Sequence, residues 1–454
     1  MTKRHNLDFT QGDIKKHLFH FSWPIFMTNL LQSSYQIIDS LWVGNLIGDD
    51  ALGAVSLSSA VIFTVLSFII GINGATLTVL SQKRGANDEE GLKQALNAFV
   101  VIQGSLALFL SFLGFVFSGT ILNGLGTPAS LFPLAQSYLQ VNFLGIIFLF
   151  GYNFIGTVLR AMGNSSAPLR FVTIAVILNT FLSPLFIAGF KLGISGAALS
   201  TVLAQGVSFV YGLYYSIRKA GVPYSVPCLP SKELVKVIAK LGIPGGLQMV
   251  AISGGSLAIM SVVASFGGAV VAGFGAAQRI EQLIMLPAVT LGSAVQSMAG
   301  QNIGANKWER VSAIAYQGCM AIVLVSLLIG AAVFIGSSWL IQLFISEADS
   351  IQFGKTYLKI IAFFFPFLGL NFVLNGIVRS AGAMFQVLVL NIISFWVLRF
   401  PLSYLFSAWR GEEGIALGIG CSFVISSMIA VLYYRFGNWK NLKLFKPTKP
   451  AQSN

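Results

Sequence analysis

The chain has 454 residues, of which 55% are hydrophobic and only 9% are charged, and its formal net charge is +13. An ordinary globular chain is about 25% charged, so this composition excludes a soluble enzyme, a secreted disulfide scaffold and a disordered chain. The basic excess is typical of the cytoplasmic face of a membrane protein, and we expect no nucleic-acid partner. The three cysteines (Cys228, Cys319 and Cys421) are widely separated, which predicts neither a disulfide framework nor a metal site.

A membrane helix needs roughly 20 mostly apolar residues. Charged and Gly-, Pro- or Asn-rich breaks divide the chain into twelve such stretches, expected near residues 18–46, 50–80, 94–122, 134–158, 171–190, 195–217, 240–266, 268–298, 312–345, 354–378, 384–407 and 414–434. We therefore predict an all-α integral membrane protein with twelve transmembrane helices. The loop Lys and Arg residues number 22 on one side and about 4 on the other. This asymmetry predicts a multi-pass protein of the plasma membrane with both termini in the cytoplasm.

The sequence contains an internal repeat. Three short segments recur at an offset of 219 residues, namely Gln82–Asn87 as Gln301–Asn306, Tyr138–Leu139 as Tyr357–Leu358, and Arg160–Gly163 as Arg379–Gly382. Pro24 matches Pro244 at an offset of 220. The repeat predicts two pseudo-two-fold-related six-helix bundles. We assign residues 1–217 to an N-terminal lobe, 218–239 to a cytoplasmic linker, and 240–454 to a C-terminal lobe with a basic cytoplasmic tail.

The arrangement of the repeat indicates a transporter. Because each half holds an even number of spans, both halves enter the membrane with the same orientation and the pseudo-two-fold axis lies along the membrane normal. Two lobes around such an axis leave a cleft between them, which is the plan of an alternating-access carrier. The chain has no Gly-x-x-x-x-Gly-Lys-Ser/Thr phosphate-binding loop, so we expect a secondary, ion-driven carrier without a cofactor.

Five segments carry a resemblance to a known family, namely Asp39–Gly44, Leu159–Asn164, Asn179–Phe186, Gln278–Leu283 and Trp396–Leu402. Through the order of these segments and their expected depth in the membrane, the chain resembles the multidrug and toxic compound extrusion (MATE) transporters. These belong to the multidrug/oligosaccharidyl-lipid/polysaccharide flippase superfamily. The last two segments most resemble the branch named for DNA-damage-inducible protein F. The resemblance implies V-shaped paired bundles that export cationic or amphipathic compounds against H⁺ or Na⁺. An integral-membrane enzyme would need a clustered catalytic set at membrane depth, and the chain offers one Asp, one Glu and no His there, so we expect no enzyme.

Asp39 and Glu281 are the two acidic residues, of 15 in the chain, that are expected at membrane depth. An ionisable residue at that depth is costly and indicates function. Gln32 and Gln36 precede Asp39 on the same helix face, and Tyr35 lies one turn before it. Burial disfavours the charged form of a carboxyl, which suits a group that loads and releases a proton. The alternative is that Asp39 is permanently hydrogen-bonded and only fixes helix packing.

Two further predicted helices carry polar residues at i and i+4 spacing, Asn179 with Ser183 and Thr201 with Gln205. The resemblance implies that these faces pack around Asp39. Relatives often have an aspartate where this chain has Ser183. Asp39 would then be the only charged ligand of a Na⁺ site, helped by Asn179, Ser183 and Thr201. Because proton coupling needs only one titrating carboxyl, we favour H⁺, whereas Na⁺ stays open because hydroxyls and amides can complete a shell of oxygen ligands.

Pro24 is the candidate for helix bending in the first span. A proline inside a helix removes a hydrogen bond and permits a kink. Our mechanistic hypothesis is that protonation of Asp39 lets the helix bend, so that the cavity of the N-terminal lobe shrinks and the drug leaves outward. The alternative is that Pro24 only marks the first turn of its helix.

The candidate substrate-binding residues are Tyr35, Gln36, Asn153, Glu281 and Met285. Aromatic and Met side chains adapt to many shapes and attract organic cations. Glu281 and Met285 share one helix face, although Glu281 would also serve as a structural contact. We expect cationic or amphipathic drugs and membrane lipids as partners, and a monomer.

The sequence favours other functions and sites less. A lipid-linked saccharide flippase of the same superfamily would favour several arginines in the cleft, and only Arg279 and Arg399 are expected at membrane depth. A set of three histidines before or at the start of the first span (His5, His17 and His20) indicates interface anchoring rather than a metal site. The basic run Arg435–Lys449 is typical of a tether to anionic lipid.

Overall fold

The computed structural model describes residues 7–442, 444 and 445. The first half of the chain forms the N-lobe, which consists of α1 (Ile14–Leu46), α2 (Asp49–Gly85), α3 (Glu89–Gly124), α4 (Phe132–Leu144), α5 (Ile146–Ala161), α6 (Ser166–Pro184), the π-helix η1 (Leu185–Gly189) and α7 (Gly193–Arg218). Side-chain carboxylates cap the start of two of these helices. Asp13 accepts a hydrogen bond from the Lys16 amide at the start of α1, and Asp88 accepts one from the Gly91 amide at the start of α3.

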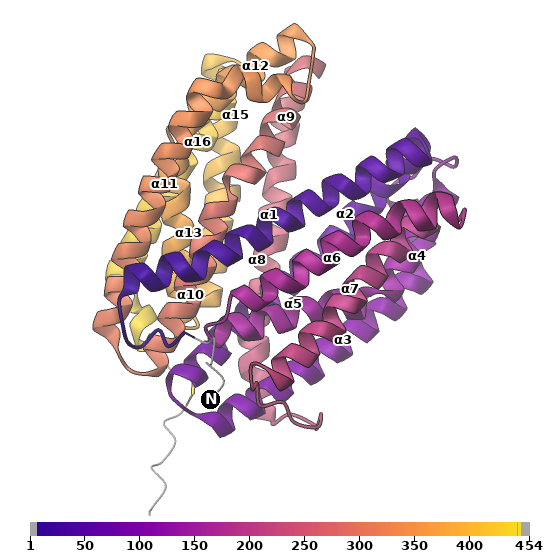
Figure 1. Ribbon diagram of the computed structural model, residues 1–454. Helices are drawn as coiled ribbons and strands as arrows, with labels where there is room; N and C mark the ends of the chain where they lie inside the picture. Colours follow the sequence, from indigo (N-terminus) through magenta and orange to yellow (C-terminus); the bar gives the residue numbers. More distant parts are fainter. Residues whose placement is uncertain (1–6, 443, 446–454) are drawn as a thin grey trace, which may run out of the picture.

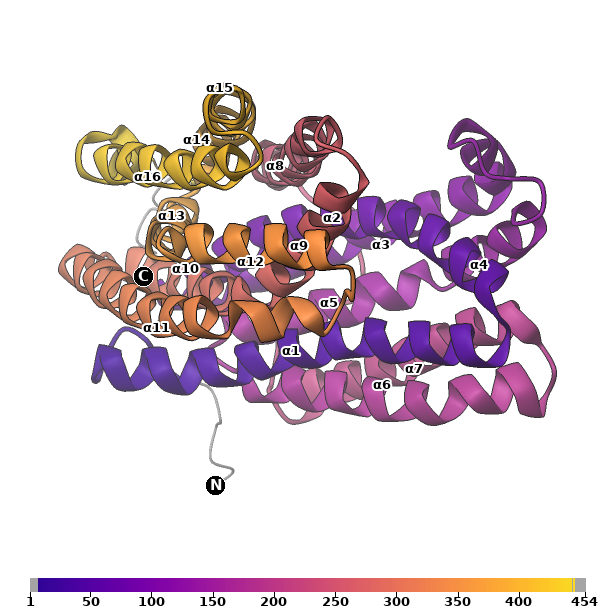
Figure 2. The same ribbon diagram turned by 90° about the horizontal axis from the view of Figure 1, so that it is seen from above.

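The second half forms the C-lobe. It consists of α8 (Lys232–Ala264), α9 (Gly268–Ile284), α10 (Leu286–Gly304), α11 (Trp308–Gln342), α12 (Ala348–Ala362), α13 (Phe365–Ser380), α14 (Met384–Ile392), the π-helix η2 (Ile393–Arg399), α15 (Phe400–Arg410) and α16 (Glu413–Phe436), followed by the short 3-10 helix η3 (Asn438–Asn441). Figure 1 shows the two lobes meeting near the start of α1 and diverging toward the other end. Figure 2 shows α2 of the N-lobe beside α8 of the C-lobe.

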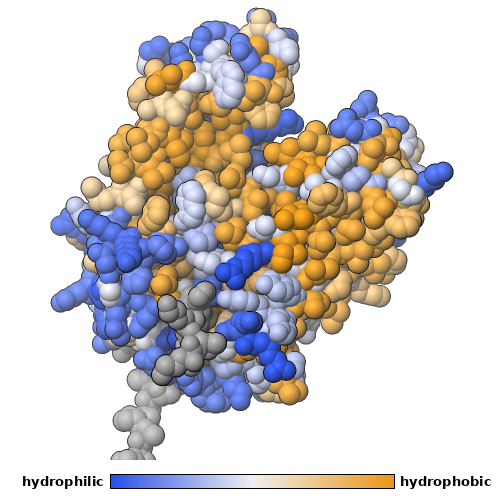
Figure 3. Space-filling view, in the orientation of Figure 1, coloured by the Kyte–Doolittle hydropathy of each residue, from blue (hydrophilic) through white to orange (hydrophobic). Residues whose placement is uncertain are grey.

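The all-helical membrane fold predicted from the sequence is confirmed. Among the described residues, nine helices are long and apolar enough to span a membrane, and the bent pairs α4–α5 (48°) and α12–α13 (55°) raise the number to 11. α1 is 33 residues long but is not among these span-capable helices, so the twelfth predicted span stays a prediction. Figure 3 shows apolar side chains over the middle of both lobes and hydrophilic side chains at their ends, as a bilayer requires.

The helices extend beyond the apolar stretches that predicted them. α8 begins at Lys232, within the predicted linker 218–239, because the Ser231 hydroxyl accepts from the Leu234 amide and caps the helix. Only residues 219–231 between α7 and α8 are non-helical. Several predicted cytoplasmic cations lie outside the described residues, namely Lys3, Arg4, Lys443, Lys446 and Lys449, as does His5.

The repeat is visible in the contacts between the lobes. The Gln82 amide donates to the Ser380 carbonyl oxygen over 2.6 Å, and the Gln301 amide donates to the Ala161 carbonyl oxygen over 2.8 Å. Donors and acceptors are both related by the offset of 219. We call this end of the molecule the closed end; α2 and α10 cross there so closely that a Cβ on Gly85 would overlap the Gln301 carbonyl.

Each lobe also contributes the start of its first helix to the core of the other. Phe21 and Ile25 of α1 belong to a buried cluster whose other members come mainly from α10, α11 and α13. Ile238 and Leu241 of α8 belong to a buried cluster built mainly from α2, α3 and α5. The lobes are therefore joined by apolar packing at the closed end, where burial is the dominant stabilising force. At the opposite end they diverge, and Figure 3 shows a groove between them.

Candidate functional site

Asp39 lies in a buried polar cluster of the N-lobe. Only 6% of the residue is exposed. The Ser183 hydroxyl of α6 donates to Asp39 Oδ1 over 3.4 Å, and the side chains of Asn179 and Tyr138 also lie against the carboxyl. Helices α1, α4 and α6 thus converge on one acid that was predicted from its depth in the sequence.

Helix α7 completes this N-lobe polar cluster, which we define as Asp39, Tyr138, Asn179, Ser183, Ser200 and Thr201. The Asn179 amide donates to the Ser200 and Thr201 hydroxyls over 3.4 and 3.2 Å. The hydroxyls of Ser183 and Ser200 lie 2.7 Å apart. Asn179 Oδ1 is buried and finds no hydrogen-bond partner within the described part of the chain. The structure therefore brings together all four residues predicted for ion coupling, Asp39, Asn179, Ser183 and Thr201.

Two members of the cluster were not predicted. Tyr138 was noticed only as a repeated residue, and its recurrence as Tyr357 was the signal that could have marked it. Ser200 precedes Thr201 in the sequence, but it lies one position off the i, i+4 face that Thr201 forms with Gln205. Its hydroxyl nonetheless contacts both Asn179 and Ser183.

The Asp39 carboxyl has no basic partner among the residues that the structure describes. Within the described part of the chain, the one ion pair joins Lys83 and Asp88 at the closed end, with 2.6 Å between Nζ and Oδ2. The described neighbours of the Asp39 carboxyl are neutral side chains. A buried carboxylate is costly unless a cation or hydrogen bonds compensate it. The cluster is therefore chemically suited to accept a proton or a small cation at Asp39.

Glu281 of α9 lies in the C-lobe beside Tyr357 of α12 and near Arg399 of η2. Among the described residues, its buried Oε1 has no hydrogen-bond partner. Arg399 packs against two aromatic rings. Its guanidinium lies 3.8 Å from the centroid of the Phe395 ring and 4.8 Å from the centroid of the Phe423 ring. Stacking of this kind stabilises a desolvated guanidinium. Glu281 therefore has a positive charge nearby, unlike Asp39.

The five predicted substrate-binding residues do not share one pocket. Tyr35 lies one turn before Asp39, and its buried hydroxyl lies beside Thr201. Gln36 is exposed on α1. Asn153 and Met285 line two different cavities, and Glu281 lies in neither lining. The set stays a prediction, distributed over both lobes.

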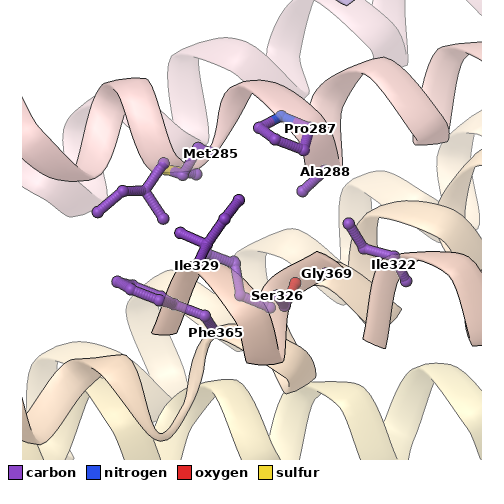
Figure 4. A pocket seen from close by; sticks show the side chains of 10 residues that line it. Met285, Pro287, Ala288, Ile322, Ser326, Ile329, Phe365 and Gly369 are labelled. Carbon is purple, nitrogen blue, oxygen red and sulfur yellow. The ribbon is translucent and has the colours of Figure 1, made fainter. Parts of the chain in front are cut away.

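Both cavities are far smaller than a drug site. The cavity beside Met285 has a volume of about 10 Å³, and Figure 4 shows its mostly apolar lining between α10, α11 and α13. The cavity beside Asn153 has a volume of about 40 Å³. Pockets for drug-sized ligands measure roughly 300–1,000 Å³. Figure 3 also shows a groove between the two lobes.

Pro24 lies in the interior of α1, since the helix begins at Ile14. The alternative that it marks the first turn is therefore wrong. The Thr28 hydroxyl donates to the Pro24 carbonyl oxygen over 2.7 Å. Farther along α1, Ser33 and Ser34 donate in the same way to Asn29 and Leu30. Such back-bonding hydroxyls commonly bend helices, so α1 contains several residues that allow bending.

Comparison with known proteins identifies the family. The model of the MatE family matches the chain twice, over residues 24–185 and 244–405. The chain belongs to the MatE family. The two matches coincide with the two lobes and begin 220 residues apart, as expected for a duplicated unit. Because MatE proteins are transporters, the prediction that the chain is not an enzyme is confirmed.

Individual relatives extend over nearly the whole MatE chain. The probable multidrug resistance protein YpnP of Bacillus subtilis is 57% identical over 438 residues, which is 96% of this chain and 98% of the relative. A solved multidrug resistance MATE family transporter in an outward-facing conformation has a TM-score of 0.89 at 22% identity, covering 96% of this chain and 98% of that one. A solved MATE protein in a bent conformation has a TM-score of 0.90 at 22% identity, covering 97% and 98%. These structures support the fold of the MatE chain.

Proposed function

We propose that this MatE protein is a secondary transporter that exports cationic or amphipathic drugs in exchange for protons, with Asp39 as the protonation switch. The observation that carries the proposal is the isolation of Asp39, which is 6% exposed and is surrounded by neutral side chains. A carboxyl in such a place alternates readily between a neutral and a charged form as its access to water changes. Neutralisation by one proton is the simplest way to remove its charge.

The relatives support drugs as the substrate class. The 57% identical relative is described as a probable multidrug resistance protein, and a 25% identical relative from Staphylococcus aureus is described as a multidrug export protein. The groove between the lobes supplies the space that the two small cavities do not. We propose that drugs bind there, with Tyr35, Gln36, Asn153, Glu281 and Met285 as the residues to test first.

The proposed cycle follows from the position of Asp39 on α1. α1 contacts α6 of its own lobe and α10 of the other lobe, so a change in its shape affects both. Protonation removes the charge of Asp39 and loosens its hydrogen bond with Ser183. Bending near Pro24 then narrows the N-lobe and expels the drug outward. Release of the proton toward the cytoplasm resets the cluster.

Sodium is the second candidate for the coupling ion. The N-lobe polar cluster is rich in oxygen, and Asn179 Oδ1 is buried without a donor. Such an oxygen would serve as a Na⁺ ligand together with Asp39, Ser183 and Ser200, because hard cations prefer oxygen ligands. The same oxygen would also accept a hydrogen bond from a protonated Asp39. We favour the proton because Asp39 is the single carboxylate of the cluster.

Several finer assignments belong to the same proposal. We place both termini in the cytoplasm of a plasma-membrane protein, which makes the closed end the cytoplasmic end. Gln278–Leu283 and Trp396–Leu402 support the branch named for DNA-damage-inducible protein F. One chain contains the whole N-lobe polar cluster, so we propose a monomer that needs neither metal nor nucleic acid. A lipid-linked saccharide flippase is less favoured, since Arg399 is stacked between two phenylalanines inside the C-lobe.

The test is ethidium efflux from proteoliposomes under a pH gradient or a Na⁺ gradient imposed separately. Proton antiport requires efflux that follows the pH gradient at constant Na⁺. Efflux that follows only the Na⁺ gradient would replace H⁺ by Na⁺ as the coupling ion. Efflux indifferent to both gradients would remove the antiporter proposal.

A further inference from the structure

The two ends of the described chain lie at equivalent places of the repeat. At the N-terminal end, the backbone of Leu7 packs so closely on Gly163 of the N-lobe that a Cβ on the glycine would overlap it. Near the C-terminal end, the side chain of Leu444 packs in the same way on Gly382 of the C-lobe. Gly163 and Gly382 are related by the offset of 219, and both have left-handed φ values, of 83° and 91°. Glycine tolerates this conformation and lets another segment approach closely.

Each end of the described chain also reaches the opposite lobe, again at equivalent residues. The Asn302 amide at the end of α10 donates to the Phe9 carbonyl oxygen over 3.0 Å. The repeat equivalent of Asn302 is Lys83, at the end of α2, and its Nζ lies 4.0 Å from the centroid of the Phe445 ring. Both ends therefore bridge the lobes at the closed end, in positions that the repeat relates to each other.

Trp439 of η3 fixes the start of the C-terminal bridge in the C-lobe. Its side chain is fully buried in the cluster around α10, α11 and α13, and it stacks on Tyr434 with ring centroids 5.3 Å apart. Leu442 still packs against this cluster, whereas Leu444 and Phe445 pack against the buried cluster built mainly from α2, α3 and α5. The chain thus crosses from one lobe to the other within a few residues.

The two bridges differ in how they are held. In the N-terminal bridge Phe9 is fully buried, and Arg310 donates to three carbonyl oxygens of the segment Leu7–Asp13 over 3.1 Å each. Leu444 and Phe445 are only partly buried, and in the part of the chain that the structure describes they make no hydrogen bond to the N-lobe. Apolar packing and a partly exposed cation–π contact leave no unpaired backbone group when they separate, so the C-terminal bridge costs less to break.

We propose that Leu444 and Phe445 form a detachable strap that keeps the lobes together at the closed end and leaves the N-lobe when they separate there. Its contacts with Gly382 and Lys83 belong to different lobes, so separation of the lobes cannot preserve both. Trp439 stays buried in the C-lobe, which keeps the strap close to its docking site and lets it return. The inference rests on the proposed function only in that alternating access requires the closed end to open.

The experiment measures separation of the lobes with spin labels at Glu90→Cys and Glu309→Cys, exposed positions at the starts of α3 and α11, in a background without the three native cysteines. Pulsed electron paramagnetic resonance is recorded on the full chain in detergent, without drug or an ion gradient. The strap variant combines Leu444→Ala with Phe445→Ala. Its matched control is Phe436→Ala, which truncates an aromatic residue that is 76% exposed at the end of α16.

The strap variant should raise the ratio of separated to closed lobes about fivefold, whereas Phe436→Ala should leave it unchanged. Phe445→Trp, which keeps an aromatic face for Lys83, should retain the wild-type distribution. An unchanged distribution in the strap variant, or an equal change in Phe436→Ala, would overturn the proposal. Gly85→Ala is the positive control, because it should separate the lobes without altering the strap. A widened distribution in a strap variant whose parent exports no dye would support the strap and refute only the proposed function.

Discussion

Tyr138 and Tyr357 occupy equivalent positions of the two repeats, and each hydroxyl lies beside a buried carboxyl from a different helix. In the N-lobe the acid is Asp39 of α1. In the C-lobe it is Glu281 of α9, whereas the position that corresponds to Asp39 lies close to the buried, apolar Ile259. Both repeats thus contain the tyrosine, whereas the acid lies on α1 in the N-lobe and on α9 in the C-lobe. The surroundings differ too, since Arg399 lies near Glu281 only.

Asp39→Asn should lower the initial rate of pH-driven dye efflux about tenfold or more, because the amide cannot exchange the proton that a buried carboxyl exchanges. Substrate binding measured by fluorescence should persist, since the amide still fits among Ser183, Asn179 and Tyr138. Asp50→Asn is the matched control, because Asp50 is exposed at the start of α2. An Asp39→Asn protein with full pH-driven efflux would refute the protonation switch.

Glu281→Gln should behave differently. The variant removes the carboxyl that lies nearest to Arg399, and we expect a loss of about 1–2 kcal/mol of unfolding free energy because a buried charge loses its electrostatic partner. Proton-driven efflux should continue, since the N-lobe polar cluster is unchanged. The KM for a cationic dye is measured in the same assay. If Glu281 binds the substrate, this KM should rise in the Glu281→Gln variant. Loss of the response to pH would assign coupling to the C-lobe.

The spans were predictable because a helix in lipid must satisfy its own backbone hydrogen bonds within an apolar stretch. The ends of the helices were not predictable in this way, because a count of apolar residues ignores polar sequence. Capping by Ser231 extends α8 into such sequence, and capping by Asp88 does the same for α3. The repeat was predictable down to backbone conformation. Asn87 and Asn306, paired in the sequence, both adopt left-handed φ values of 52° and 57°, which asparagine tolerates better than most residues.

The candidate site was predictable in part. Depth in the membrane singled out Asp39, and i, i+4 spacing singled out Asn179, Ser183 and Thr201, because both signals are local in the sequence. Tyr138 lies on α4, and α4 is bent by 48° relative to α5 at Gly145. No local sequence pattern predicts the direction in which such a bend orients a side chain.

Gly85→Ala should disrupt the closed end, because the new Cβ would overlap the Gln301 carbonyl oxygen, which belongs to the backbone of α10 and cannot rotate away. We expect the lobes to separate there. Spin labels on the exposed residues Glu90 and Glu309 would report a longer or broader distance distribution. Gly104→Ala is the control in α3, since a Cβ at that position meets nothing within 4 Å. Equal distributions in both variants would contradict a closed end that depends on close backbone packing.

Asp88 predicts a measurable dependence of stability on pH. Partial burial acts against its charged form, but hydrogen bonds from Lys83 and the Gly91 amide outweigh it and hold the pKa of Asp88 below its usual value of 3.8. A lowered folded-state pKa contributes stability above the unfolded pKa, and this contribution disappears as the pH falls through the folded pKa. The pair is partly exposed, so Asp88→Asn should cost about 0.5–1 kcal/mol at pH 7.

The pH dependence separates the charge of Asp88 from its capping role, because asparagine also caps helices well. Unfolding of wild-type and Asp88→Asn proteins should converge as the pH falls below 4. The variant Lys83→Met should show the same loss at pH 7, and the double variant should be no worse than either single one. A loss in Asp88→Asn that persists unchanged at low pH would show that the cap, and not the charge, is responsible.

Phe9 fixes the segment Leu7–Asp13 across the closed end. The Leu7 amide donates to the Gly163 carbonyl oxygen of the N-lobe, whereas the carbonyl oxygen of Phe9 accepts from Asn302 and Arg310 of the C-lobe. The Phe9 ring is fully buried and packs edge-to-face on Phe21, with centroids 4.8 Å apart. Phe9→Ala should cost about 3 kcal/mol of unfolding free energy, because it leaves a cavity between the lobes and loosens hydrogen bonds to both.

Phe19→Ala is the control for this change. Phe19 is 70% exposed on α1, so its truncation creates no internal cavity and should change unfolding in detergent only slightly. Hydrogen exchange then distinguishes local from global effects. In Phe9→Ala, amides near Gly163 and Gln301 should exchange faster, while those around Asp39 should keep wild-type rates because the N-lobe polar cluster lies in the diverging part of the molecule. Uniformly faster exchange throughout both lobes would mean that Phe9 stabilises the whole fold and does not specifically hold the closed end together.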